Sequence, residues 1–152
     1  MRSIRAARLT GGVVAFLLTP PVAALFLAVA ATVAGDAQVD FFFMVLIFGT
    51  IEGFVVAAPV AFLLGALVGQ WCSRKYASGH SRLQVLSASA AFMTAGGALH
   101  GAVLAAFNAA HFIDLHWTLV PVGGAAGTIA GTAVAYAITT VRRQVHGVQQ
   151  AS

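Results

Sequence analysis

Two ionisable side chains lie deep inside apolar stretches of this sequence, where an unpaired charge would be costly. Glu52 interrupts the apolar run from Phe41 to Cys72, ten residues beyond Phe42. At the rise of an α-helix this is about 15 Å, close to the middle of a bilayer. A carboxylate at that depth must be protonated, paired or hydrated, and an intramembrane acid is a candidate functional site by default.

His100 is the candidate partner of Glu52. It lies nine residues before Ala109, about 13 Å along a helix, so the two side chains are expected at similar depths. Both are flanked by glycines four residues apart, which allow close helix contacts. These pairs are Gly49 and Gly53 around Glu52, and Gly97 and Gly101 around His100. We therefore expect a Glu52–His100 contact, which would serve as a proton relay, an ion-binding pair or an interhelical lock.

A second constellation, His111, Asp114 and His116, falls within six residues of an expected outer loop. Imidazole and carboxylate ligands suit Zn, Cu, Fe or Ni, although the spacing matches no strong metal signature. The alternative interpretation is a polar loop without a ligand. The sequence has no phosphate-binding glycine loop, cysteine pair, HExxH motif or nucleophile elbow, so it predicts no cofactor.

Four stretches that lack Lys and Arg are long enough to position these residues within a membrane. The chain is 60% hydrophobic and 8% charged, whereas soluble domains carry about 25% charged residues. Spans are expected near 10–33, 42–68, 84–109 and 117–140. The predicted fold is all-α, a single domain over residues 1–152 that forms a four-helix bundle of up-down-up-down topology in the lipid bilayer.

Charge distribution predicts the orientation of these spans. All eight Lys and Arg residues lie near the two chain ends or at the loop between the second and third expected spans. The other two loops contain no Lys or Arg. Because positive residues concentrate in cytoplasmic loops, both termini are expected in the cytoplasm, in a bacterial inner membrane. The alternative is that Arg2, Arg5 and Arg8 begin a signal peptide, although the first apolar run is longer than a signal core. Nothing in the sequence resembles a basic nucleic-acid-binding face.

Small residues form a regular ridge along the fourth span. Gly123, Gly127 and Gly131 repeat every four residues, a pattern that brings helices into close contact. Such a ridge serves either as a seam between two copies of the protein or as a packing surface for another helix of the same chain.

The leading functional hypothesis is a small structural or accessory membrane protein that self-associates or belongs to a larger complex. The first alternative is a proton- or ion-coupled transporter or channel that uses Glu52 and His100. The second is a membrane-embedded enzyme with a cleft lined by Glu52, His100 and Asn108. The sequence contains no enzyme motif that would favour this last class.

Overall fold

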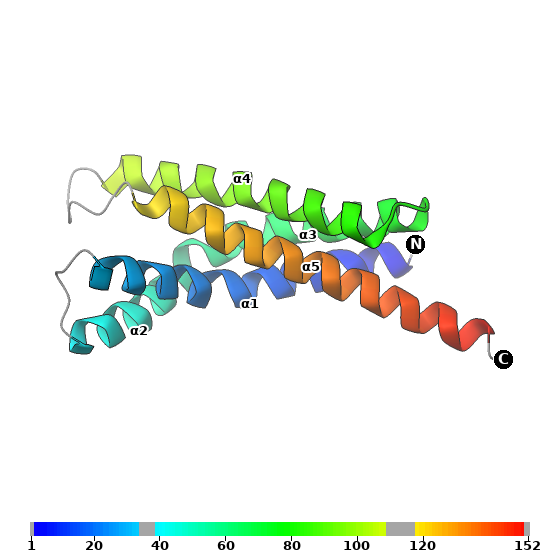
Figure 1. Cartoon of the computed structure of the whole chain (residues 1–152), viewed down its shortest axis with the longest axis horizontal. Helices are drawn as coiled ribbons and strands as arrows, with labels where there is room; N and C mark the ends of the chain where they lie inside the picture. The colour runs from blue at the N-terminus through cyan, green and yellow to red at the C-terminus, as the bar shows by residue number, and fades with distance from the viewer. Residues whose placement is uncertain (1, 34–38, 109–117, 151–152) are drawn as a thin grey trace.

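The computed structural model describes residues 2–33, 39–108 and 118–150, and the regular structure in these ranges is helical, without strands. Figure 1 shows the helices in order along the chain. They are α1 (Arg2–Val33), α2 (Val39–Val56), α3 (Ala58–Ala77), α4 (Arg82–Asn108) and α5 (Leu119–Gln150). The predicted all-helical class is therefore confirmed for the described part of the chain.

Three helices are long and apolar enough to cross a membrane, over Ile4–Val33, Arg82–Ala106 and Leu119–Val141. The helices α2 and α3 meet this criterion only as a pair, and they are bent by 63° relative to each other. The span expected over 42–68 thus consists of two helices that meet at Ala57. Residues 109 and 117, at the edges of the third and fourth expected spans, lie outside the described ranges.

Pro59 explains the bend between α2 and α3. It lies at the first turn of α3, lacks a backbone N–H, and has a ring that crowds the carbonyl four residues earlier. Ala57 nevertheless donates a hydrogen bond to the Gly53 carbonyl and accepts one from Ala61, both at 2.9 Å. The helical ladder therefore continues around the bend. In contrast, α1 continues as one helix through Pro20 and Pro21.

The helices associate as two closely packed pairs. The most extensive contacts join α4 to α5 and α1 to α3, and α1 also packs against α2 and α5. In Figure 1, α4 and α5 lie side by side over the first part of α5, and the C-terminal part of α5 extends away from α4. The first turns of α1, the last turns of α5 and the turn between α3 and α4 all lie at the same end of the molecule.

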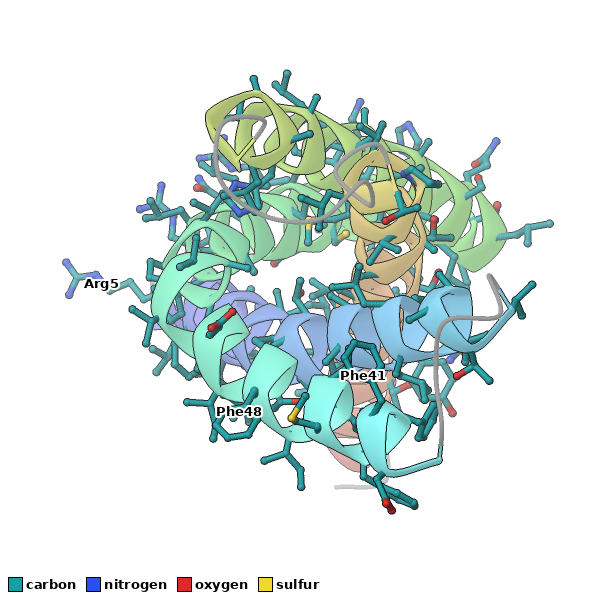
Figure 2. The ribbon with its side chains drawn as sticks, turned by 90° about the vertical axis from the view of Figure 1, so that its left-hand side faces the viewer. Arg5, Phe41 and Phe48 are labelled. Atoms are coloured by element: carbon teal, nitrogen blue, oxygen red, sulfur yellow. The ribbon has the colours of Figure 1, made fainter. Side chains whose placement is uncertain are left out.

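The interior is formed mainly by small side chains, whereas large apolar side chains point outwards. Alanines such as Ala15, Ala28 and Ala126 are fully buried. Large side chains are exposed, including Phe48 at 60% and Leu83 at 75%. Figure 2 shows side chains projecting from all sides of the bundle. This distribution suits helices that pack on one another through small residues and are covered by lipid.

Candidate functional site

Glu52 lies on an exposed apolar face of α2. The four residues Phe48, Ile51, Glu52 and Val55, hereafter the Glu52 face, follow helical spacing and are all exposed. The opposite side of α2 packs on α1, because Gly49 lies against Ala24 and Gly53 lies against Pro20. Glu52 makes no hydrogen bond or ion pair with the residues that the structure describes. It therefore forms the only ionisable group on a surface that is otherwise apolar.

His100 lies on α4, partly buried within the bundle. Its Nε2 atom is buried and has no hydrogen-bond partner among the described residues. The glycines beside it pack against α5, since Gly97 contacts the backbone of Gly123 and Gly101 contacts that of Leu119.

The structure does not join Glu52 to His100 by a hydrogen bond or an ion pair. The flanking glycines do lie at close helix contacts, but the two pairs face different helices. Gly49 and Gly53 face α1, whereas Gly97 and Gly101 face α5. Matched depth and matched glycines do not determine how each helix is rotated about its axis. Asn108 is the last residue of α4, and its side chain lies outside the described part.

The expected metal ligands His111, Asp114 and His116 lie outside the described residues. Within the ranges that the structure describes, no three His, Cys, Asp or Glu side chains are grouped so that they could hold a metal ion.

The glycine ridge of α5 packs within the chain. A Cβ atom at Gly123 would overlap the Gly97 carbonyl, and one at Gly127 would overlap the Met93 carbonyl. Gly131 similarly lies against the Ser89 carbonyl, at 2.6 Å from a Cβ position. We refer to this contact of α4 with α5 as the α4–α5 seam. The hydroxyls of Thr94 and Thr128 also meet across these helices, 2.6 Å apart.

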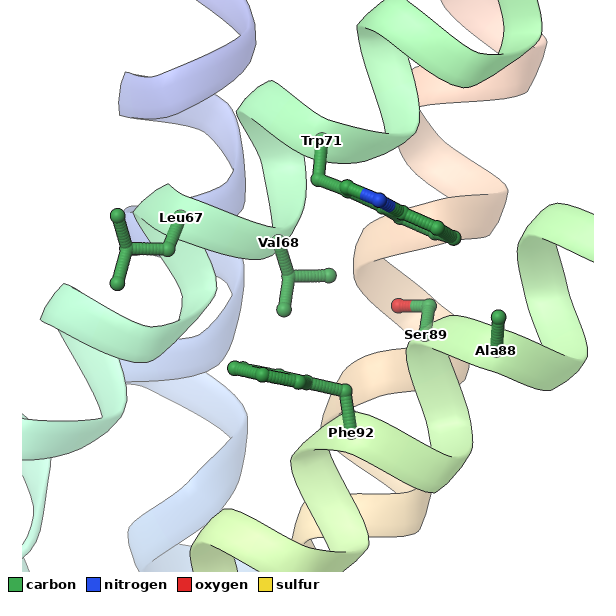
Figure 3. A pocket seen from close by; sticks show the side chains of 6 residues that line it. All are labelled: Leu67, Val68, Trp71, Ala88, Ser89 and Phe92. Atoms are coloured by element: carbon green, nitrogen blue, oxygen red, sulfur yellow. The ribbon is translucent and has the colours of Figure 1, made fainter.

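A groove of about 380 Å³ lies between α3 and α4 and was not anticipated from the sequence. In Figure 3 the rings of Trp71 and Phe92 bound this α3–α4 groove from opposite sides. Both aromatic residues are exposed, whereas Val68 and Ser89 are buried and form its floor. The remaining lining residues are Leu67 and Ala88, which are also exposed. The groove therefore opens to the side of the bundle, where lipid would lie.

The turn after α3 connects the two helices that line this groove. The helix ends in a Schellman motif, in which His80 N–H donates to the Lys75 carbonyl at 3.2 Å and Gly79 N–H donates to Tyr76 at 3.3 Å. Gly79 has a φ of +89°, the left-handed conformation that this motif requires. The motif satisfies carbonyl groups that would otherwise lack partners at the helix end.

A capping box begins α4 immediately afterwards. Ser81 N–H donates to Gln84 Oε1 at 3.0 Å, and Gln84 N–H donates to Ser81 Oγ at 3.3 Å. The next residue, Arg82, ties α4 to α5, because its Nη2 donates to Thr140 Oγ1 at 3.3 Å and its guanidinium lies 4.5 Å from the Tyr136 ring centroid. The spacing of Ser81 and Gln84 in the sequence is the signal that would have identified this helix start.

Two basic residues follow the groove-lining part of α3 in the direction of this turn. Arg74 and Lys75 follow Trp71 by three and four residues, so all three share one face of α3. Neither basic side chain forms an ion pair with a described residue. The face of α3 that lines the apolar groove therefore continues into two basic residues.

Comparison with known proteins identified no relative that would bear on the Glu52 face or the α3–α4 groove. The chain matches no protein-family model, and no curated protein or solved structure matches it.

Proposed function

We propose that the chain is a small multi-pass membrane protein with a structural or accessory role, and that it binds another membrane protein through the Glu52 face. In this proposal α1, α4 and α5 are three spans, and α2 with α3 forms a fourth, bent span. The exposed large side chains and the small interior support embedding in lipid. A soluble environment would leave those apolar surfaces in contact with water.

The orientation follows from where the basic residues lie. The start of α1, the α3–α4 turn and the end of α5 share one end of the molecule. All eight Lys and Arg residues belong to these three regions of the sequence. By the positive-inside rule this end faces the cytoplasm, which places both termini there, in a bacterial inner membrane.

The observation that carries the proposed role is the exposed carboxyl group of Glu52 on an apolar helix face. A carboxyl group in contact with lipid is unfavourable unless it is neutralised or hydrogen-bonded. No described residue of the chain supplies that partner. A hydrogen-bond donor or cation within a span of another protein would do so, and Phe48, Ile51 and Val55 would pack around the contact.

Removal of the carboxyl group tests this role. In Glu52→Leu the face stays apolar and the internal contacts of α2 remain, so the folded chain should retain its thermal stability. The complex should weaken by about 1–2 kcal/mol, which corresponds to roughly five- to thirtyfold in affinity. Native electrophoresis of mildly solubilised membranes would show the wild-type chain in a larger assembly and Glu52→Leu mainly as a free chain.

Thr132→Leu is the matched control, because it removes an exposed hydroxyl from α5 in the same apolar setting. This variant should migrate with the wild type. Equal migration of Glu52→Leu and wild type would rule out the Glu52 face as the contact. If the larger assembly contained only this chain, the partner at the Glu52 face would be a second copy of the protein.

A further inference from the structure

We propose that the α3–α4 groove binds an anionic phospholipid, with an acyl chain between Trp71 and Phe92 and the headgroup phosphate at Arg74 and Lys75. This inference rests on the membrane embedding proposed above, but it does not require the accessory role or the Glu52 contact. It concerns a different face of the molecule and a different class of ligand.

The interior of the groove suits a hydrocarbon chain. Its volume of about 380 Å³ lies within the usual range of small-molecule sites, roughly 300–1,000 Å³. The only polar side chain on the floor is Ser89, and its hydroxyl already donates to the Gly131 carbonyl at 2.7 Å. The floor therefore offers no free hydrogen-bond donor to a polar ligand. An acyl chain would fill the space without leaving a polar group unsatisfied.

The end of the groove suits an anionic headgroup. Arg74 and Lys75 lie about one helical turn beyond Trp71 on the same face, and neither is paired with a described carboxylate. The indole of Trp71 adds an N–H donor at this boundary, where Trp side chains favour the lipid ester region. Arg82 is not available in the same way, because it binds Thr140 and Tyr136 on α5.

The order of apolar and basic residues along α3 matches that of the acyl chain and the headgroup in a lipid. Leu67, Val68 and Trp71 contact the apolar part, and the basic pair follows without an intervening apolar turn. Each Lys or Arg near an anionic membrane surface contributes about 1 kcal/mol of attraction, which corresponds to about fivefold in affinity. Two such residues at one groove favour an anionic lipid over a zwitterionic one.

Fluorescence of Trp71 tests the proposal directly. The chain has two tryptophans, so Trp117→Phe leaves Trp71 as the sole indole. The full chain is reconstituted into phosphatidylcholine vesicles with a minor fraction of either brominated phosphatidylglycerol or brominated phosphatidylcholine. Bromine on an acyl chain quenches a neighbouring indole. At equal fractions, brominated phosphatidylglycerol should quench Trp71 more strongly.

Two sets of variants, each with its own control, locate the site. Arg74→Gln and Lys75→Gln should each lower the preference for the anionic lipid about fivefold. Arg5→Gln, which removes an exposed charge that projects away from the bundle, should leave it unchanged (Figure 2). Ala88→Phe fills the groove and should reduce quenching by both lipids, whereas Ala91→Phe, at another exposed alanine of α4 outside the groove, should not.

The possible outcomes separate this inference from the proposed function. Equal quenching by the two brominated lipids would overturn the anionic-lipid site while leaving membrane embedding intact. Arg74→Gln and Lys75→Gln behaving like Arg5→Gln, or Ala88→Phe behaving like Ala91→Phe, would also overturn it. Absence of quenching by either lipid in a correctly reconstituted sample would mean that protein, not lipid, covers Trp71.

Discussion

At Gly79 the backbone adopts a φ of +89°, and a Cβ atom built there would have no neighbour within 4 Å. A substitution at this position therefore tests backbone conformation without steric contacts. Gly79→Ala should lower the stability of the protein by about 1–2 kcal/mol, because the left-handed region is unfavourable for a residue with a Cβ atom. Thermal unfolding in detergent micelles would measure the loss.

Gly79→Asn is the control for this interpretation. Asn tolerates the left-handed conformation better than Ala, so its stability should fall between those of the wild type and Gly79→Ala. If Ala and Asn were equally destabilising, the left-handed conformation would not be the cause.

Glu52 and His100 show what residue-level reasoning could and could not predict. The sequence identifies both as polar groups inside apolar stretches, and that assignment depends only on local composition. Whether two such groups meet depends on the rotation of each helix about its axis. The structure directs Gly49 and Gly53 towards α1 and Gly97 and Gly101 towards α5, so the glycines that suggested a common contact lie in two separate ones.

At the scale of the helices, the α4–α5 seam predicts that two adjacent glycines differ in how much stability is lost when each is replaced by alanine. At Gly123 a Cβ atom would overlap the Gly97 carbonyl, whereas at Gly124 its nearest neighbours lie 3.7 Å away. Gly123→Ala should therefore cost about 1–3 kcal/mol of stability through overpacking. Gly124→Ala should not lower stability, because the added Cβ atom would make only ordinary contacts and alanine favours a helix over glycine by up to about 1 kcal/mol.

Thermal unfolding of the two variants in the same detergent provides the comparison. Both substitutions are identical in chemistry and adjacent on α5, so a difference in helix propensity cannot explain a difference between them. Equal stabilities would mean that the backbones of α4 and α5 are not as close as the seam requires.

Helix composition predicts that spans exist, but it does not predict their internal breaks. The absence of Lys and Arg identified the apolar stretches, and each described helix overlaps one of them, although most of the helices extend into the neighbouring basic segments. Pro20, Pro21 and Pro59 all lie in such stretches, yet α1 continues through the first two and the chain bends by 63° near the third. In lipid, neighbouring helices decide whether a proline is accommodated, and those neighbours are not given by the local sequence.

The α3–α4 groove was missed for a related reason. Its lining comes from two helices, with Trp71 on one and Phe92 on the other, and no local motif links them. The turn between these helices is easier to predict from the sequence, because a serine followed three residues later by a glutamine is a recognised helix start. Local signals thus predict where elements begin more readily than what lies between them.

At the scale of the whole molecule, the proposed orientation can be tested with single cysteines. Cys72 is buried and is the only cysteine, so Cys72→Ala gives a background without thiols. In that background Ala37→Cys should react with a membrane-impermeant maleimide from outside intact cells. Ser78→Cys, in the exposed α3–α4 turn, should react only after the membrane is permeabilised.

The reverse pattern would invert the orientation, and labelling of both positions from outside would contradict a span between them. A third position, Ser3→Cys, checks the N-terminal end, which should behave like Ser78→Cys. Cleavage of a signal peptide before the second span would remove this position from the mature protein.

The glycine contacts between α1 and α3 and between α4 and α5 lie in different halves of the chain. Gly11, Gly65 and Gly69 hold α1 against α3, and the α4–α5 seam holds the other pair, so each contact is complete within one half of the chain. The only covalent link between these halves is the short turn at residues 78–81. A chain interrupted at that turn would keep the contacts of these glycines within each half, although Gly96 on α4 contacts Leu64 on α3 across the two halves. If the proposed membrane topology is correct, the first half of the chain would have all partners of the Gly11, Gly65 and Gly69 contacts before the second half is synthesised.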